Sequence, residues 1–324
     1  MAKIFITRRL PEEGLKMLDE HEVEIFEGDA PPSKQEIIEG TRGKDALICL
    51  LTDKIDSEVM NASSNLKIIA NYAAGYDNID IDEATKRGIF VTNTPGVLTE
   101  TVADLAWALI LAAARRIVEG DKFMREGKFK GWAPMLLLGS DVYGKTLGIV
   151  GAGRIGQAVA KRAKGFNMRI LYYSRKRKEN FEKECNAEYV DLETLLREAD
   201  FVSLHTPLTP ETYHMIGEKE LKMMKSSAYL INTGRGKCVD EKALVKALKE
   251  GWIRGAALDV FENEPEIEPE LKELENVVLT PHIGSASYET RSRMAVMVAE
   301  NVLAALKGEI PPNCINPEAA NYRD

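Results

Sequence analysis

The sequence lacks a hydrophobic run long enough to cross a membrane. Its longest uninterrupted apolar stretch, residues 105–114, has ten residues, whereas a transmembrane helix needs about 20. The N-terminal residues MAKIFIT pass directly into a strand-like pattern and show neither the long apolar core nor the small-residue cleavage site of a signal peptide. We therefore expect no membrane partner and a cytoplasmic location.

Cysteine and histidine are scarce and are not spaced for metal binding. The four cysteines are far apart and form no C-x-x-C pair, and the four histidines show no ligand spacing with one another or with the cysteines. The cytosol keeps thiols reduced. We therefore predict no disulfide framework and no metal site.

The sequence also has no excess of positive charge. Its 43 basic side chains are outnumbered by 51 acidic ones, which gives a net charge of -8. Because phosphate backbones are bound by clustered Lys and Arg, we do not expect a nucleic-acid partner. The 324 residues, 44% of them hydrophobic, fit two globular domains of roughly 150 residues each. Small molecules and proteins are the expected partners.

Short apolar runs rich in β-branched residues alternate with longer helical stretches along the whole sequence. This alternation is typical of βαβ units, so the predicted fold class is α/β, with two doubly wound parallel-sheet domains. The strand candidates of the first series are 3–7, 22–26, 46–51, 66–70 and 89–92. Those of the second series are 146–150, 169–173, 201–204, 228–232, 256–259 and 277–280.

A long apolar helix predicted over 99–119, capped by Thr99, separates the two series of strands. A last helix, predicted over 287–307, has no strand after it, so we expect it to cross back onto the first domain. The predicted first domain is therefore discontinuous, residues 1–98 and 284–324, and encloses a second domain, residues 99–283.

A glycine-rich segment lies between the strand candidate 146–150 and the helix that follows it. It has the pattern G-x-G-x-x-G, which predicts a dinucleotide-binding turn when a strand precedes it and a helix follows. The first glycine allows the tight turn, the second lets the backbone approach a pyrophosphate, and the third lets the helix pack on the strand. Its residues are Gly151, Ala152, Gly153, Arg154, Ile155 and Gly156.

The segment after the next strand bears on which dinucleotide binds. An NAD site of this type usually has an acidic residue about 20 positions after the glycines, which holds the ribose hydroxyls. This chain has Ser174 there, followed by four cations that begin with Arg175 and Lys176. Cations attract a 2′-phosphate, so NADP(H) is favoured. If the basic run is only a solvated helix start, NAD(H) could still bind through Ser174.

Three polar segments follow predicted strands at their carboxyl ends, where open α/β sheets place ligands. They are residues 232–236, 259–265 and 280–286. An arginine, a glutamate and a histidine on three such loops can converge on one pocket, and they are the minimum set for reducing a 2-oxo acid. The candidates are Arg235, Glu264 and His282, with Glu262 as the alternative carboxylate.

These motifs make the chain similar to the D-isomer-specific 2-hydroxyacid dehydrogenases, among which it most resembles the archaeal-type glyoxylate/hydroxypyruvate reductases. The resemblance covers nearly the whole chain and is carried by NYAAGYDNID at 71–80, VTNTPG at 91–96, GKTLGIVG at 144–151, NTGRG at 232–236 and PHIGSA at 281–286. It implies a Rossmann dinucleotide-binding domain inserted in a flavodoxin-like substrate domain. It also implies hydride transfer from NAD(P)H to glyoxylate, with hydroxypyruvate as a second substrate.

The resemblance implies roles for single residues. Arg235 would orient the substrate carboxylate and carbonyl. His282 would protonate the carbonyl oxygen, and Glu264 would accept a hydrogen bond from the other ring nitrogen and keep the imidazole protonated near neutral pH. We expect His214 and His205, the latter at a strand end near the cofactor, to pack or cap rather than to catalyse.

Further positions are implied for substrate, cofactor and partner. Ala74 and Gly75 would donate backbone N–H groups to the substrate carboxylate, and Leu51 would bound the pocket. Trp132 would either reach across a homodimer interface into the neighbouring active site or pack in the interface or core. The implied cofactor contacts are Gly151, Ala152, Gly153, Arg154, Ile155, Gly156, Ser174, Arg175, Lys176, Thr233, Gly234, Arg235, Asp259 and His282.

The chain departs mildly from the family pattern, and other functions stay open. Ala74 stands where larger residues such as Val are common, and Gly234 where Ser is common; the first change loosens the pocket. A dehydrogenase specific for hydroxypyruvate or phosphoglycerate is one alternative. A formate dehydrogenase is disfavoured because Glu264 occupies the place of a Gln. A dinucleotide-sensing corepressor-like protein would keep the same residues and differ by its slow turnover.

Overall fold

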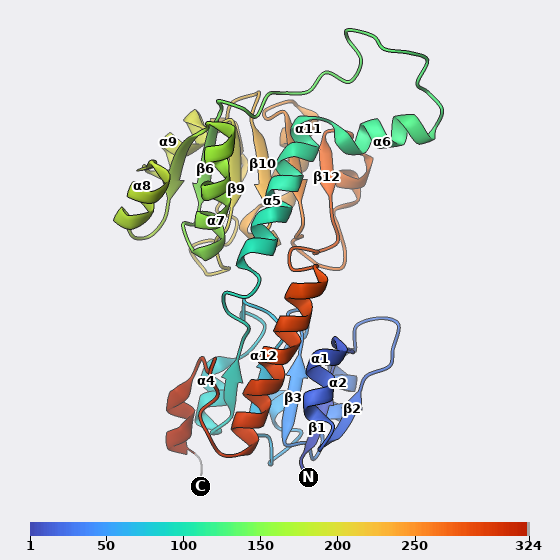
Figure 1. Cartoon of the computed structure of the whole chain (residues 1–324), viewed down its shortest axis with the longest axis vertical. Coiled ribbons are helices and arrows are strands. Elements are labelled where there is room, and N and C mark those ends of the chain that lie inside the picture. Colours follow the sequence, from blue (N-terminus) through green and yellow to red (C-terminus); the bar gives the residue numbers. More distant parts are fainter. Residues whose placement is uncertain (323–324) are drawn as a thin grey trace. The chain divides into compact units, whose positions relative to one another are not determined.

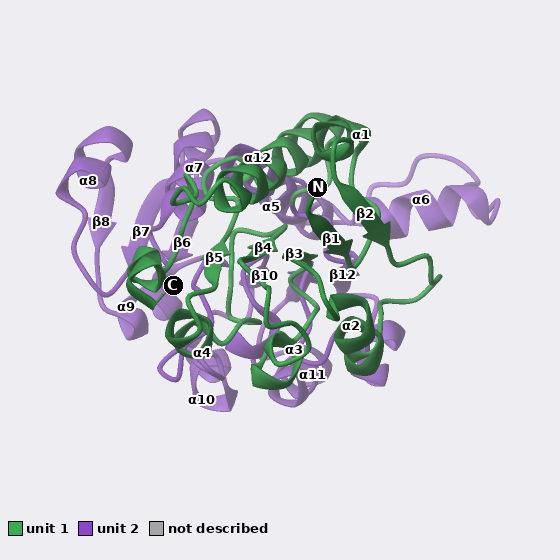
Figure 2. Cartoon of the chain, turned by 90° about the horizontal axis from the view of Figure 1, so that it is seen from below, with its two compact units in different colours: residues 1–98, 285–324 green, residues 99–284 purple. Residues whose placement is uncertain are grey.

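The computed structural model describes residues 1–322 and divides the chain into two compact units. Unit 1 consists of residues 1–98 and 285–324, and unit 2 of residues 99–284 (Figure 2). Each unit is built on one parallel sheet, which confirms the predicted α/β fold class. None of the helices in the described part of the chain has the length and apolar character needed to cross a membrane.

Unit 1 contains a five-stranded parallel sheet with the strand order β2-β1-β3-β4-β5 (Figure 2). β3 and β4 are buried along their whole length, as expected for strands that are covered on both faces. Each strand predicted for the first domain is present, within two residues at its start. The strands are β1 (Lys3–Ile6), β2 (Glu22–Ile25), β3 (Ala46–Cys49), β4 (Ile68–Asn71) and β5 (Phe90–Thr92).

Side chains of alternating residues enter two separate cores, one on each face of the first sheet. Ile4 packs with Val298 and Val302 of the last helix, whereas Phe5 packs on the opposite face with Ile37. The last helix therefore lies on the first sheet. The helices of unit 1 are α1 (Glu12–Leu15), η1 (Lys16–Leu18), α2 (Lys34–Thr41), α3 (Ser57–Met60), α4 (Ile81–Lys86), α12 (Tyr288–Leu306) and η5 (Pro317–Tyr322).

Unit 2 contains a seven-stranded parallel sheet with the order β12-β11-β10-β9-β6-β7-β8. The sequence predicted six of these strands and missed β8, because this edge strand has three residues and only Ala187 among them is buried. The strands are β6 (Thr146–Val150), β7 (Arg169–Tyr173), β8 (Ala187–Tyr189), β9 (Phe201–Leu204), β10 (Tyr229–Asn232), β11 (Gly255–Leu258) and β12 (Val277–Leu279).

The long helix predicted over 99–119 is wrong in its extent. It ends at Ala114, and a second helix starts at Ile117, because Arg116 between them has a left-handed backbone with φ of 53°. The helices of unit 2 are α5 (Thr99–Ala114), α6 (Ile117–Arg125), α7 (Arg154–Ala163), η2 (Lys164–Phe166), α8 (Glu179–Cys185), α9 (Leu192–Glu198), α10 (Glu218–Met223), η3 (Gly236–Cys238), α11 (Glu241–Lys249) and η4 (Pro269–Glu273).

The strand order of unit 2 reverses between β6 and β9. From β6 the chain winds outward through β7 and β8, and then returns to β9 and winds the other way to β12. Ligands bind in open α/β sheets at such a switch point, beyond the carboxyl ends of the strands. The loops after β6, β10, β11 and β12 all start at this edge.

Candidate functional site

The glycine-rich loop connects β6 to α7, and its three glycines have different surroundings. At Gly151, φ is +97°, and a Cβ would lie 2.8 Å from the carbonyl oxygen of His205. A Cβ on Gly156 would clash with the carbonyl oxygen of Gly151. At Gly153, which precedes α7, no atom lies within 4 Å of an added Cβ. Packing therefore explains the first and third glycines, and the second faces space that a pyrophosphate can occupy.

The four cations after β7 are not equivalent. Arg177 makes a two-fold hydrogen-bonded ion pair with Glu182, with both distances at 2.8 Å. The bonds from Arg177 and Tyr172 lower the pKa of Glu182 to about 2. Arg175 and Lys176 are exposed and make no ion pair with any residue from 1 to 322, so both can meet an anion.

A buried carboxylate shapes the loop that carries His282. Asp259 is 1% exposed and accepts hydrogen bonds from the Thr280 hydroxyl at 2.7 Å and from the amides of Ile283 and Gly284, both at 2.8 Å. Burial raises the pKa of Asp259, although these bonds and the nearby imidazole oppose that rise. His282 itself has a left-handed backbone with φ of 52°. Asp259, expected from the sequence only as a cofactor contact, also organises this loop.

His282 and Glu264 form a hydrogen-bonded pair. The distance between His282 Nδ1 and Glu264 Oε2 is 2.8 Å, and Glu264 Oε1 accepts a bond from the Phe261 amide at 2.9 Å. Burial alone would raise the pKa of Glu264, but the bond to His282 and the positive charges around it outweigh burial and lower this pKa. The His282 side chain is 28% exposed, and its Nε2 has no partner within the described chain. That nitrogen is therefore available to a substrate.

The alternative carboxylate, Glu262, has other partners. Its Oε1 lies 2.8 Å from Nε2 of His214, and its amide donates to Glu241 Oε1 at 2.6 Å. Glu262 and His214 thus connect this loop to the segment before α10. The geometry assigns Glu264, not Glu262, to His282.

His205 is the first residue after β9, at the carboxyl edge of the sheet of unit 2. Its Nε2 is 2.9 Å from the Ser203 hydroxyl, and its Nδ1 is 3.5 Å from that of Thr233. Desolvation by burial lowers the pKa of His205 to about 3. A ring that stays neutral at pH 7 is a poor proton donor, and its hydrogen bonds hold the loop after β10.

Arg235 follows β10 and lies immediately before η3. The carbonyl of Arg235 accepts a bond from the Asn232 side chain at 2.9 Å, and its Nη1 donates to the carbonyl of Gly234 at 3.0 Å. The guanidinium charge contributes to the lowered pKa of Glu264. A Cβ on Gly234 would lie 3.2 Å from the carbonyl oxygen of Thr206, so a serine there would need its neighbours to shift.

The residues expected to bind substrate in the first domain lie on two adjacent loops of unit 1. Leu51 follows β3, whereas Ala74 and Gly75 follow β4, and these strands are neighbours in the sheet. Three asparagines that were not predicted from the sequence lie around these loops: Asn71, Asn78 and Asn93. Two of them lie inside the motif NYAAGYDNID, but the motif does not show what their amides bind.

Trp132 is 84% exposed, so it does not belong to a core of unit 2.

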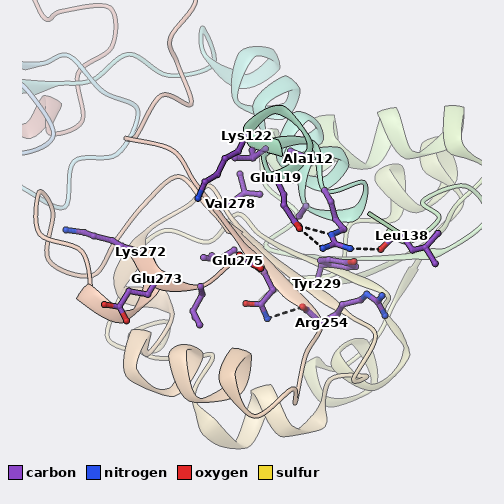
Figure 3. A pocket seen from close by; sticks show the side chains of 16 residues that line it. Ala112, Glu119, Lys122, Leu138, Tyr229, Arg254, Lys272, Glu273, Glu275 and Val278 are labelled. Atoms are coloured by element: carbon purple, nitrogen blue, oxygen red, sulfur yellow. Dashed lines mark hydrogen bonds and ion pairs between the residues drawn. The ribbon is translucent and has the colours of Figure 1, made fainter. Parts of the chain in front are cut away.

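A cavity of about 750 Å³ lies under α6 (Figure 3). Its wall includes Tyr229 and Val277, the first residues of β10 and β12. The cavity is therefore at the amino edge of the sheet, opposite the loops that carry Arg235 and His282.

Comparisons with known proteins agree with this geometry. Residues 107–284 match the family described as D-isomer specific 2-hydroxyacid dehydrogenase, NAD binding domain, so the cofactor of unit 2 is a nicotinamide dinucleotide. The chain is 64% identical to a glyoxylate reductase of Korarchaeum cryptofilum, over 99% of this chain and 98% of that protein. It is 62% identical to a glyoxylate reductase of Thermococcus litoralis, over 98% and 97%.

Solved structures are also similar. A protein from Thermus thermophilus has a TM-score of 0.91 and 50% identity, with 97% of this chain and 99% of that chain covered. An NADPH-dependent glyoxylate/hydroxypyruvate reductase of Sinorhizobium meliloti, in complex with NADP and malonate, has a TM-score of 0.88 and 33% identity, with 98% of each chain covered. These relatives confirm the family resemblance seen in the sequence.

Two alanine substitutions in the glycine loop should separate binding from folding. Gly153→Ala places a methyl group where only a ligand would meet it, so we expect dinucleotide affinity to fall by about tenfold or more with little change in the free energy of unfolding. Gly156→Ala should lower that free energy by roughly 1–3 kcal/mol, because the methyl group overlaps the Gly151 carbonyl. Fluorescence titration and urea unfolding measure the two effects. Equal affinity of Gly153→Ala and the unmodified protein would contradict the assignment.

Proposed function

The chain belongs to the D-isomer specific 2-hydroxyacid dehydrogenase family, and on this premise we propose that it is a glyoxylate reductase that also accepts hydroxypyruvate. The observation that carries the proposal is the hydrogen-bonded pair of His282 and Glu264 at the carboxyl edge of a dinucleotide-binding sheet, with the charge of Arg235 beside it. The relatives named glyoxylate reductase support this choice of substrate.

Reduction requires a hydride at the carbonyl carbon and a proton at the carbonyl oxygen. The reduced nicotinamide supplies the hydride when it is bound. His282 donates the proton from Nε2, since Nδ1 is held by Glu264. The C=O double bond becomes C–O–H, the substrate gains the two electrons that the dinucleotide loses, and His282 recovers a proton from solvent.

Arg235 binds the substrate oxygens in this proposal. Its forked guanidinium suits a carboxylate and an adjacent carbonyl, and it stabilises the negative charge that develops on the carbonyl oxygen. The amides of Ala74 and Gly75 bind the carboxylate, and Leu51 bounds the pocket. The cofactor contacts are the loop 151–156, Ser174, Arg175, Lys176, Thr233, Gly234, Asp259 and His282 together with Arg235.

The proposal is tested by following nicotinamide absorbance with glyoxylate, hydroxypyruvate and pyruvate, each with NADPH and with NADH. We expect rapid oxidation with glyoxylate. His282→Ala should lower kcat by about 10²–10⁴-fold while dinucleotide affinity is kept, since the variant loses a general acid. Tight dinucleotide binding with no turnover of any of the three acids would favour a dinucleotide sensor or a bulkier substrate.

The two glutamates offer a matched pair for the pH dependence. The lowered pKa of Glu264 means that this group stays a carboxylate below its ordinary titration range, so a negative charge stays beside the His282 ring. Glu264→Gln removes that charge, and the pH above which reduction declines should move to a lower value. Glu262→Gln, which contacts His214, should leave it in place. Equal shifts in the two pH profiles would contradict the assignment of Glu264.

We further propose that NADP(H) is the preferred cofactor, because Arg175 and Lys176 are exposed and neither forms an ion pair with a carboxylate in residues 1–322. Replacing both by alanine should raise the KM for NADPH by about tenfold or more, since charge-assisted hydrogen bonds to the phosphate are lost, and leave the KM for NADH unchanged. Lys219→Ala, at an exposed site on α10, is the control. Equal loss for both cofactors would oppose recognition of a 2′-phosphate.

A homodimer through α6 and the segment after it completes the proposal. This segment extends away from the sheet of unit 2 (Figure 1), and monomers rarely expose large contiguous apolar patches. A two-fold interface would cover its apolar side chains and carry Trp132 toward the partner's active site. The exposed residues are Ile117, Val118, Met124, Phe129, Trp132, Met135 and Leu138.

Sedimentation and kinetics test the dimer together. Val118→Glu with Met124→Glu should give a monomer with little reductase activity, because burial of two charges opposes association. Trp132→Ala should stay dimeric and raise the KM for glyoxylate. Ile310→Glu, at an exposed apolar position in unit 1, is the control and should change neither property. A monomeric unmodified protein that is fully active would exclude this interface.

A further inference from the structure

In the loop after β4, three successive residues have bonded carbonyl groups and unbonded amide groups. The carbonyls of Ala74, Gly75 and Tyr76 accept hydrogen bonds from Asn93 Nδ2 at 2.6 Å, Asn71 Nδ2 at 2.8 Å and the amide of Ile79 at 3.1 Å. Within residues 1–322, the amides of Ala74, Gly75 and Tyr76 donate to no acceptor. Successive backbone N–H groups without an acceptor can donate to an anion.

Both side-chain N–H groups of Asn71 and both of Asn78 are hydrogen-bonded. Asn71 is fully buried, and its Nδ2 donates to the carbonyl of Gly75 and, at 3.1 Å, to Asn78 Oδ1. Asn78 Nδ2 donates to the carbonyls of Leu50 and Asp53, both at 3.0 Å. Because a side-chain amide has two N–H groups, each is satisfied, and Asn78 connects the loop after β4 to the loop after β3.

A buried carboxylate fixes the loop after β3. Asp53 is 3% exposed, and its Oδ2 accepts bonds from the Thr7 hydroxyl at 2.6 Å and the Leu50 amide at 2.7 Å. Leu51, the next residue, is thereby held beside the Asn78 bridge. Hydrogen bonds through Asn78 therefore contribute to the spacing between the loop that carries Leu51 and the loop that carries Ala74 and Gly75.

We propose that Asn71, Asn78 and Asn93 are positioning residues that set where the carboxylate of the 2-oxo acid binds and, through Leu51, how long an acid the pocket accepts. This inference rests on the proposed function. Asn71 and Asn93 bind the carbonyls of Gly75 and Ala74, and Asn78 joins this loop to the loop that precedes Leu51, so the N–H groups of Ala74 and Gly75 are left for the carboxylate. An amide is required at these positions because the Nδ2 group of each faces acceptors, and a carboxylate of the same shape would place an oxygen against them.

Asn78→Asp is the sharpest test, because it keeps the shape and places a carboxylate against two carbonyl oxygens. We expect the KM for glyoxylate to rise by about ten- to a hundredfold, since a small misplacement of a binding group has effects of this size. The KM for the dinucleotide should stay within about twofold, and the preference for glyoxylate over pyruvate should shrink. Asn65→Asp, an exposed change of the same charge in unit 1, should alter none of these.

Variants with a smaller change serve as the test if Asn78→Asp does not fold. Asn78→Ala and Asn93→Ala remove donors without adding charge, and smaller increases in the KM for glyoxylate are expected. An unchanged KM in folded, dinucleotide-binding variants would overturn the inference. So would a parallel loss of kcat, dinucleotide affinity and unfolding free energy, which is the pattern of a purely structural role.

The unmodified protein separates this inference from the proposed function. If it reduces none of the tested acids, the proposed function fails, and binding of oxamate in the presence of dinucleotide replaces turnover as the measurement. Weaker oxamate binding by Asn78→Asp than by Asn65→Asp would then support the anion site. Equal binding by the two variants would overturn it.

Discussion

The carboxylate of Asp259 is the constraint on which the candidate site depends. It is buried at the carboxyl end of β11 and is satisfied by three donors from the segment after β12. A buried charge is tolerated only when it is paired or hydrogen-bonded, so this segment must keep the conformation that supplies those donors. His282 lies between Thr280 and Ile283, so the hydrogen bonds that these residues donate to Asp259 also fix the position of His282.

In both units, side chains hydrogen-bond to the backbone of the loops that follow the strands. Parallel strands end with their backbone groups at one edge of a sheet, and the loops there need side-chain partners because no further strand supplies them. In unit 2 a carboxylate collects amides, which fixes the backbone around His282. In unit 1 the side-chain amides of Asn71 and Asn93 bind the carbonyls of Gly75 and Ala74, whose own N–H groups donate to no acceptor within residues 1–322. The chemistry of the buried side chain decides which backbone groups are left for a ligand.

Much of the fold could be read from the sequence because the central strands are buried on both faces and appear as short apolar runs. β8 was not predicted, because it lies at an edge and buries only one side chain. The break between α5 and α6 was not predicted either. Apolar residues continue past Ala114 as Ile117 and Val118, and only the left-handed backbone of Arg116 ends the helix.

The sequence by itself determined the sheet type, the glycine loop and the residue types of the site, since these depend on local patterns and on neighbours along the chain. The tertiary structure decided which groups are paired. Glu262 and Glu264 are two positions apart on one irregular loop, and no local pattern distinguishes them. The fold turns Glu262 toward His214 and Glu264 toward His282, because the partners that fix these side chains come from segments distant in the sequence, namely Glu241 and His214 for Glu262, and His282 for Glu264.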